Sequence, residues 1–366
     1  MKSLNFLKRE YGQQSLFTIL LLTVHPSSAV DNYDRGATVS GELRLGAVSI
    51  DDADSLNAET FSIGGKLGYQ SSVYRGVSTG ITFYTSNPMD GYDEASLFLS
   101  SDAKGYSIPG EAYINMLFGE TNLMFGRQEI DSPFADTDDI GMIPNTFEAL
   151  HLNNTSLANT TLTVAYLHRW AGVDSEMPET FTRLNNDRGI NVFGVAYQSN
   201  DKWNLQAWHY FAKAATDMSY LEANIMPSDT LQFGVQYASQ HGGDFDGDVW
   251  GVSAEYTFQN TRLGAAYNQV SGGKVSNGFG GGPFFTSSED HTVADVEDQR
   301  AASLSLEYTG IQNLTLGAYY VDFDKTENEL DWVASVALHE AFTFDVIYSD
   351  MNTDGKMVRG FLAYHF

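Results

Sequence analysis

The sequence of 366 residues contains no cysteine, and only 20 basic residues stand against 47 acidic ones. Without cysteine, neither a disulfide framework nor a thiolate metal site is available. The formal net charge of −27 argues against nucleic acid as a partner, because phosphates are bound by basic surfaces. Strong acidity often marks disorder, but 42% hydrophobic and 13% aromatic content favours a folded chain.

Long hydrophobic runs are also missing. Near the N-terminus, Lys2, Lys8 and Arg9 precede a short apolar segment, 16–24, and small residues at 27–29 follow it. This pattern is typical of a secretory signal peptide, which we assign to residues 1–29; the alternative is a short buried helix. After residue 29 no run reaches the roughly 20 apolar residues of a membrane-spanning helix. If the mature chain, 30–366, enters a membrane, it must do so as a closed β-barrel.

Alternation of apolar and polar residues dominates the mature chain. In 38–48, Val39, Leu43 and Leu45 share one face of a strand, while Glu42 and Arg44 share the other. The same pattern recurs at 61–70, 230–238, 250–258, 304–308, 332–338 and 342–348. Alternating segments of about ten residues separated by turns are typical of an all-β, antiparallel transmembrane barrel.

The connections between these segments alternate in length, with eight short and nine longer ones. A soluble β-sandwich has no reason to sort its loops in this way, whereas an outer-membrane barrel has short periplasmic turns and longer extracellular loops. The pattern predicts about 18 strands, with both termini at the periplasmic end. Because alternation is poor at 150–156 and 218–226, 16 strands are the alternative.

The last ten residues, 357–366, alternate and end on Phe366. A terminal aromatic on such a strand resembles the signal read by the outer-membrane assembly machinery, and pairing with 38–48 would close the sheet. Aromatic residues near the expected strand ends would form girdles at the two membrane interfaces: Tyr69, Tyr84, Trp203, Tyr210, Tyr237, Phe258, Trp332 and Tyr348.

Residues 131–149 form the expected loop on which the rest of the prediction depends. The loop has no Lys or Arg, and apolar residues such as Phe134 and Ile143 lie among its acids: Asp131, Asp136, Asp138, Asp139 and Glu148. Such mixed content suits a segment packed against a wall on one side and facing water on the other. In a membrane barrel that place is the lumen, so we predict that this loop folds inward and forms a constriction.

Charged residues on the inward faces of the strands would line the wall of the lumen. The predicted lining residues are Glu42, Arg44, Lys66, Arg127, Arg169, Lys202, Arg262, Glu307, Asp345 and Arg359. Arg127 is the difficult member, because it alternates in phase with Leu123 and Phe125. An Arg facing lipid at bilayer depth costs about 2–4 kcal/mol, so either a bulge changes its face or it lies near the outer rim.

Two segments carry a family resemblance. Gly126-Arg127-Gln128, the following 131–133, and 139–148 resemble the OprD-type outer-membrane porins of Gram-negative bacteria, and 279–286 is similar to a loop in one branch of that family. The resemblance implies passive diffusion of small hydrophilic solutes and ions. It also implies a monomer or a trimer among outer-membrane lipid and lipopolysaccharide. The family often has an arginine where this chain has Gly141, so with the acidic loop we expect a cation preference.

Other functions find little support in the sequence. The acidic stretch Asp244, Asp246 and Asp248 begins like a calcium loop, but Val249 occupies the position that requires glycine, and we interpret it as an external loop. No His-Glu-x-x-His or Gly-x-Ser-x-Gly motif occurs, so we predict neither an enzyme nor a cofactor. The remaining alternative is a non-conducting barrel with an adhesive or structural role.

Overall fold

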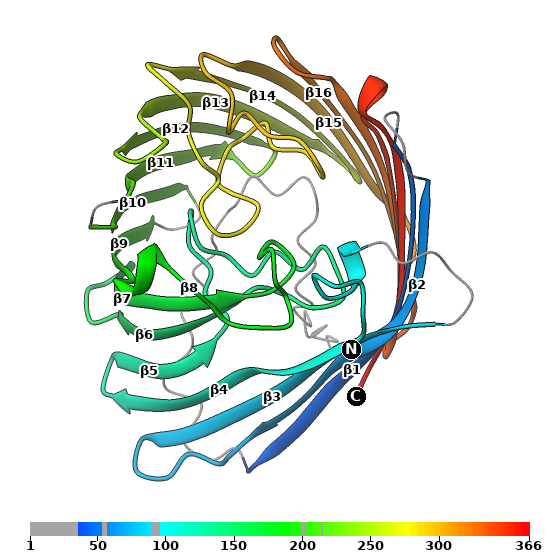
Figure 1. The fold of residues 1–366 in the computed structure, drawn as a ribbon. Helices are drawn as coiled ribbons and strands as arrows, with labels where there is room; N and C mark the ends of the chain where they lie inside the picture. The colour runs from blue at the N-terminus through cyan, green and yellow to red at the C-terminus, as the bar shows by residue number, and fades with distance from the viewer. Residues whose placement is uncertain (1–35, 53–56, 90–95, 200–201, 214) are drawn as a thin grey trace, which may run out of the picture.

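One antiparallel sheet forms a closed ring in the computed structural model, which describes residues 36–52, 57–89, 96–199, 202–213 and 215–366 (Figure 1). The expected signal peptide lies outside these residues. The strands are β1 (Thr38–Asp52), β2 (Ala58–Gln70), β3 (Val77–Pro88), β4 (Tyr106–Phe118), β5 (Thr121–Gln128), β6 (Thr146–Asn154), β7 (Thr160–Ala171), β8 (Thr182–Arg183), β9 (Ile190–Ser199), β10 (Trp203–Phe211), β11 (Asp217–Ser228), β12 (Leu231–His241), β13 (Gly247–Phe258), β14 (Thr261–Ser271), β15 (Arg300–Ile311), β16 (Leu314–Phe323), β17 (Glu329–His339), β18 (Phe342–Asp350) and β19 (Gly355–His365). Three short 3-10 helices, η2 (Ser96–Phe98), η3 (Asn185–Asp187) and η4 (Asn352–Asp354), lie between strands.

The ring closes where the first strand meets the last. Leu43 in β1 lies opposite Gly65 in β2 and Tyr364 in β19, so neither end of the sheet leaves a free edge. The two-residue β8 pairs only with the end of β7, while β7 and β9 pair directly. The wall therefore has 18 strands, which confirms the larger of the two predicted counts. The doubtful segments 150–156 and 218–226 lie within or beside β6 and β11.

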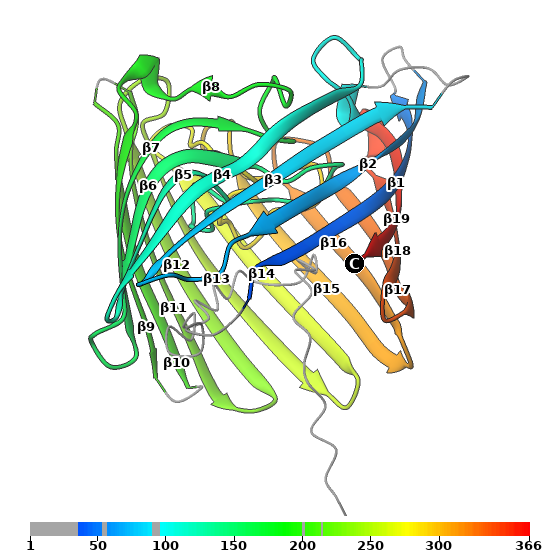
Figure 2. The ribbon, with the colours of Figure 1, turned by 90° about the horizontal axis from the view of Figure 1, so that it is seen from below.

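The loops are sorted between the two ends of the barrel (Figure 2). The longest connections, β3–β4, β5–β6, β7–β9 and β14–β15, all join their strands at one end of the barrel. The eight connections at the other end are short, and β1 begins and β19 ends there. Among the described residues no helix is long and apolar enough to cross a bilayer.

The two faces of the wall differ in polarity. In β12, Phe233, Val235 and Tyr237 are exposed on the outward face, whereas Gln232 and Gln236 are buried on the inward face. Apolar outward and polar inward faces suit a wall with lipid outside and water inside. The girdle prediction is wrong for two aromatic residues, Tyr84 and Tyr210. Both are fully buried and point inward with their neighbours.

Introducing arginine on the outward face should destabilise the barrel far more than introducing it inside. Leu304 in the middle of β15 is 64% exposed on the outward face, and Ser305 next to it faces inward. We expect Leu304→Arg to lower the free energy of unfolding in lipid vesicles by about 2–4 kcal/mol. Ser305→Arg is the matched control, and equal losses for the two variants in a denaturant titration would contradict this assignment of faces.

Candidate functional site

The site is built around the connection between β5 and β6, which lies inside the ring of strands (Figure 1). This connection, 129–145, will be called the inward loop. Phe134 on it packs edge-on against Tyr210 of β10 and Tyr220 of β11, and its backbone N–H donates to Tyr210 Oη at 3.2 Å. The loop also reaches β1 through Asp139. It therefore spans the interior of the barrel, as predicted for an inward-folded loop.

Arg44 of β1 fastens the far end of the inward loop. Its guanidinium donates from Nη1 and Nη2 to the two carboxylate oxygens of Asp139, at 2.7 and 2.8 Å, and from Nη1 to the carbonyl of Gly141 at 2.6 Å. Its Nε donates to Glu42 at 2.6 Å. A bidentate pair of this kind fixes orientation as well as charge. Arg44 holds the pKa of Asp139 below its ordinary value despite desolvation. The carboxylate of Asp139 is therefore ionised, and the guanidinium of Arg44 balances its charge.

A second loop meets the inward loop in the lumen. This loop, 272–299, will be called the crossing loop. Phe279 on it forms a short parallel bridge with Ala135, with hydrogen bonds of 2.9 Å to the Phe134 carbonyl and 3.1 Å from the Asp136 amide. On the wall, Gln236 Nε2 donates to the Pro283 carbonyl at 2.8 Å. The crossing loop thus holds the inward loop from the opposite side.

The glycine run 280–282 permits this contact. Gly280 has φ +142, and a Cβ there would lie 2.3 Å from Asp136 Oδ1. A Cβ at Gly281 would lie 2.7 Å from Asp138 Oδ2. Only residues without a side chain let the backbone approach these two carboxylates so closely.

Gly280→Ala should loosen the contact between the two loops. The added methyl would both overlap Asp136 and strain a backbone conformation that favours glycine, at a cost of about 1–3 kcal/mol. Gly119→Ala is the control, since it has φ +57 but nothing within 4 Å of its Cβ. We expect a lower thermal midpoint for Gly280→Ala than for Gly119→Ala, and equal midpoints would show that the close approach has no energetic role.

Asp136 and Asp138 lie beneath the crossing loop and contribute little surface to the lumen. Both are less than one-tenth exposed. Burial raises the pKa of Asp136 to about 7, with the charge of Asp174 as the next cause. The pKa of Asp138 is raised for the same two reasons. The sequence analysis placed these two residues among the acids of the constriction, whereas the structure places them in the packing between the two loops.

A group that the sequence analysis missed lies beside the start of the inward loop. The hydroxyl of Tyr84 lies 2.7 Å from Glu111 and 3.1 Å from Glu129. Glu129 is exposed at the residue level, but desolvation by the groups packed around its carboxyl raises its pKa to about 7, and the charge of Glu111 is the next cause. Asp131, two residues further on, is exposed, although one of its oxygens accepts from Thr137. The expected loop began at residue 131, and this boundary excluded Glu129.

Most of the predicted wall residues lie on inward faces. Arg262 lies 3.6 Å from Glu307 on the neighbouring strand, and Arg359 donates to the crossing loop. By alternation with their exposed apolar neighbours, the inward members are Glu42, Arg44, Lys66, Arg262, Glu307, Asp345 and Arg359.

Three predicted residues instead face outward at the rim of the long-loop end. Arg127 lies opposite Glu148 in the β5–β6 register, and this pair shares a face with Phe125 and Leu150, which are exposed. No register shift occurs along β5, so the rim interpretation of Arg127 is correct and the bulge interpretation is wrong. Glu148 lies on β6 rather than in the loop, and Arg169 pairs with it from β7 after a bulge.

Lys202 and the acidic stretch are the remaining predicted residues. Lys202 precedes β10 in an exposed short turn, so it is not part of the lumen wall. Asp246 contacts His241, and Asp248 accepts from Tyr237 at 2.8 Å. Within the described ranges, the carboxylates that do converge closely enough to hold a metal ion are Asp290, Glu329 and Asp331.

Comparison with known proteins places the chain in a family. It matches the family model described as outer membrane porin, OprD family, over residues 100–327, which is more than half of the chain. No curated protein sequence matches it. OccAB4 of Acinetobacter baumannii is 16% identical with a TM-score of 0.80, covering 92% of this chain and 99% of that one. OccK8 (OprE) of Pseudomonas aeruginosa is 15% identical with a TM-score of 0.78, at the same coverage.

A third structure, OpdK of Pseudomonas aeruginosa with vanillate, is 15% identical with a TM-score of 0.76, covering 90% of this chain and 98% of that one. Identities this low establish the fold, while the family match establishes the class. Porins are channels rather than enzymes, and OprD-type barrels reside in the outer membrane. This chain belongs to the OprD family of outer membrane porins.

Proposed function

We propose that the chain is a passive channel for small hydrophilic solutes and ions, narrowed by the inward loop. The observation that carries this proposal is the fastening of that loop from several sides of the ring, by Arg44 on β1, Tyr210 on β10 and the crossing loop. A segment held in this way divides the interior and leaves polar wall residues to line what remains. Polar and charged linings support the passage of hydrated solutes.

The charges beside the inward loop support a cation preference. Carboxylates outnumber basic groups here by five to two. The basic groups are Arg44 and Lys66. The carboxylates near them are those of Glu42, Glu111, Glu129, Asp131 and Asp139. An excess of negative charge in a water passage with low-dielectric walls attracts cations. Because Arg44 neutralises Asp139, we assign the preference mainly to Asp131 and Glu129 rather than to Asp138 and Asp139.

Reversal potentials across planar bilayers under a salt gradient test this preference. We expect the sign that corresponds to cation permeation, and a smaller potential when Asp131 is changed to Asn. Asp246→Asn, in the exposed loop between β12 and β13, is the matched control and should leave the potential unchanged. Anion selectivity in the unaltered channel would overturn the preference.

Solute uptake gives a second test. The OpdK structure was solved with vanillate, an aromatic carboxylate. With its acidic passage, this chain should admit a cationic or neutral solute of similar size faster than vanillate in a liposome-swelling assay. Faster entry of vanillate would contradict the proposed charge filter.

The proposal includes an orientation. We assign the end with short turns, where β1 begins and β19 ends, to the periplasm, and Phe366 to recognition by the assembly machinery. The chain-terminal segment is held in the ring by two hydrogen bonds of 3.0 Å between Gly41 and Phe366. A protease cleavage site inserted at the 119–120 turn tests the orientation in intact outer-membrane vesicles. Protection from added protease is expected, and cleavage from outside would reverse the assigned orientation.

A further inference from the structure

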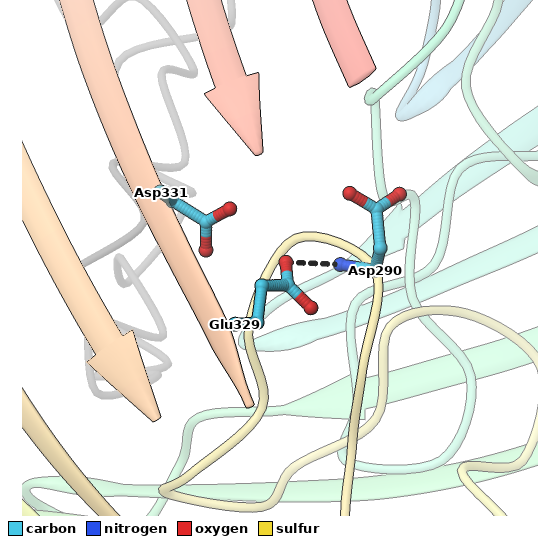
Figure 3. A group of neighbouring side chains, drawn as sticks. All are labelled: Asp290, Glu329 and Asp331. Carbon is cyan, nitrogen blue, oxygen red and sulfur yellow. Dashed lines mark hydrogen bonds between the residues drawn. The ribbon is translucent and has the colours of Figure 1, made fainter. Parts of the chain in front are cut away.

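A second cluster of carboxylates lies where the crossing loop meets β17 (Figure 3). Asp290 comes from the loop, and Glu329 and Asp331 come from the strand. One oxygen from each of the three lies within 4.8 Å of the others. Calcium–oxygen distances of about 2.3–2.6 Å place two ligands of one ion up to about 5 Å apart. A single ion between the three side chains would therefore be in reach of all of them.

The charge in this region is unbalanced. Glu329 and Asp331 are fully buried, and the side chains of Glu289 and Asp290 beside them are 6% and 17% exposed, although the Asp290 residue as a whole is exposed. The counter-charges are the guanidinium of Arg359, 2.7 Å from Glu289 and 3.1 Å from Asp290, and the imidazole of His291, 3.0 Å from Glu329.

If all four carboxyl groups are ionised, one guanidinium and one protonated imidazole leave a negative excess of two charges. Burying such an excess is costly unless a proton or a cation compensates it.

An independent observation points to a ligand in the same place. Asp331 Oδ1 is buried and has no hydrogen-bond partner in the described structure. Ser349, directly opposite Asp331 in the β17–β18 register, is also fully buried, and its hydroxyl makes no hydrogen bond. Buried polar atoms without partners are rare in folded proteins, and an ion or water commonly accounts for them.

We propose that Asp290, Glu329 and Asp331 form a binding site for a divalent cation of the size of calcium. The three carboxylates supply hard oxygen ligands, and Ser349 lies where it can add a fourth oxygen. Arg359 stays bound to Glu289 and to one oxygen of Asp290, which leaves the other Asp290 oxygen for the ion. The Asp290 amide donates to Glu329 at 3.0 Å and fixes the loop above the strand.

The site would fasten the crossing loop to the barrel wall. The same loop carries Phe279 and the glycine run that cover the inward loop. An ion at Asp331 would therefore act on the segment that holds the inward loop in place. This inference goes beyond the proposed function and does not require conduction to be correct.

Calorimetric titration of calcium chloride into the purified full-length barrel in detergent, after treatment with EDTA, tests the site directly. We expect saturable binding of about one ion per chain and an affinity at least about tenfold lower for Asp331→Asn. Asp244→Asn, which changes an exposed aspartate of the loop between β12 and β13, should bind like the unaltered protein. Glu329→Gln provides a second variant in case Asp331→Asn fails to fold.

Thermal unfolding gives a second test, in which calcium and the Asp331→Asn substitution are each expected to raise the melting temperature for a different reason. Calcium should raise the melting temperature of the unaltered barrel, because a ligand bound only by the folded state stabilises it. In EDTA, Asp331→Asn should melt above the unaltered barrel, because it removes one of the carboxyl groups that crowd together there without an ion. No calcium binding by the unaltered protein, or equal binding by Asp331→Asn, would overturn the proposal.

Discussion

Replacing Arg44 with alanine is expected to loosen the inward loop and to increase the cation preference. The change removes three hydrogen bonds to the loop and leaves Asp139 and Glu42 without their guanidinium. Removing one partner of a buried ion pair lowers the free energy of unfolding by about 3–5 kcal/mol. We expect a loss at the lower end of this range, because 30% of the Asp139 side chain is exposed. The two uncovered carboxylates would attract cations.

Asp139→Asn is the matched variant, because it breaks the same contact but leaves the positive charge in place. Both variants should show noisier single-channel currents, since both release the loop. Their reversal potentials in a salt gradient should move in opposite directions, towards cations for Arg44→Ala and away from cations for Asp139→Asn. Shifts of the same sign would mean that Arg44 and Asp139 affect selectivity only through loop position.

The second large effect is a dependence of selectivity on pH. The pKa of Glu129 is raised to about 7 by desolvation and by the charge of Glu111, so this carboxyl is largely neutral at acidic pH and charged at alkaline pH. Cation preference should therefore increase as pH rises, with most of the change between about pH 6 and pH 8. The reversal potential measured across this range, with equal buffers on both sides of the bilayer, gives the result.

Glu129→Gln should remove most of this pH dependence and leave the lower selectivity found at acidic pH. Glu120→Gln, in the turn between β4 and β5, removes one carboxylate at the opposite end of β5 and is the control. An unchanged titration in Glu129→Gln would assign the pH dependence to other groups, of which Asp136 is the first candidate because its pKa is also raised to about 7.

The wall of the barrel could be predicted from the sequence because its physical cause is local. Lipid on one face and water on the other impose a two-residue period, and residues such as Leu43 and Glu42 record it directly. Loop lengths added the strand count. The inward position of the 129–145 connection could also be inferred, because Phe134 and Asp139 require different surroundings within one loop.

The contacts within the site could not be predicted, because they join residues far apart in the chain. Arg44 and Asp139 are 95 residues apart, and Asp290 and Glu329 are 39 apart. An acidic loop predicts charge, but it does not show whether a carboxylate is neutralised, as Asp139 is, or buried beneath glycines, as Asp136 is. Those differences decide which groups can act on solutes.

The position of Arg127 could be predicted only in part. Its alternation with Phe125 was correct, and the cost of an arginine facing lipid was the reason to doubt it. The structure removes the conflict, because Arg127 lies one residue before the end of β5, beside Glu148 at 3.6 Å and over the ring of Phe181. Periodicity gives the face of a residue but not its depth in the membrane.

The single-channel conductance of the unaltered barrel and of a variant in which residues 136–142 are replaced by a short glycine–serine link tests the central claim most directly. We expect discrete current steps from both in planar bilayers, and clearly larger steps from the variant, because the segment that narrows the lumen has been shortened. Silence from both, or steps of equal size, would contradict a conducting barrel whose passage is set by its inward loop.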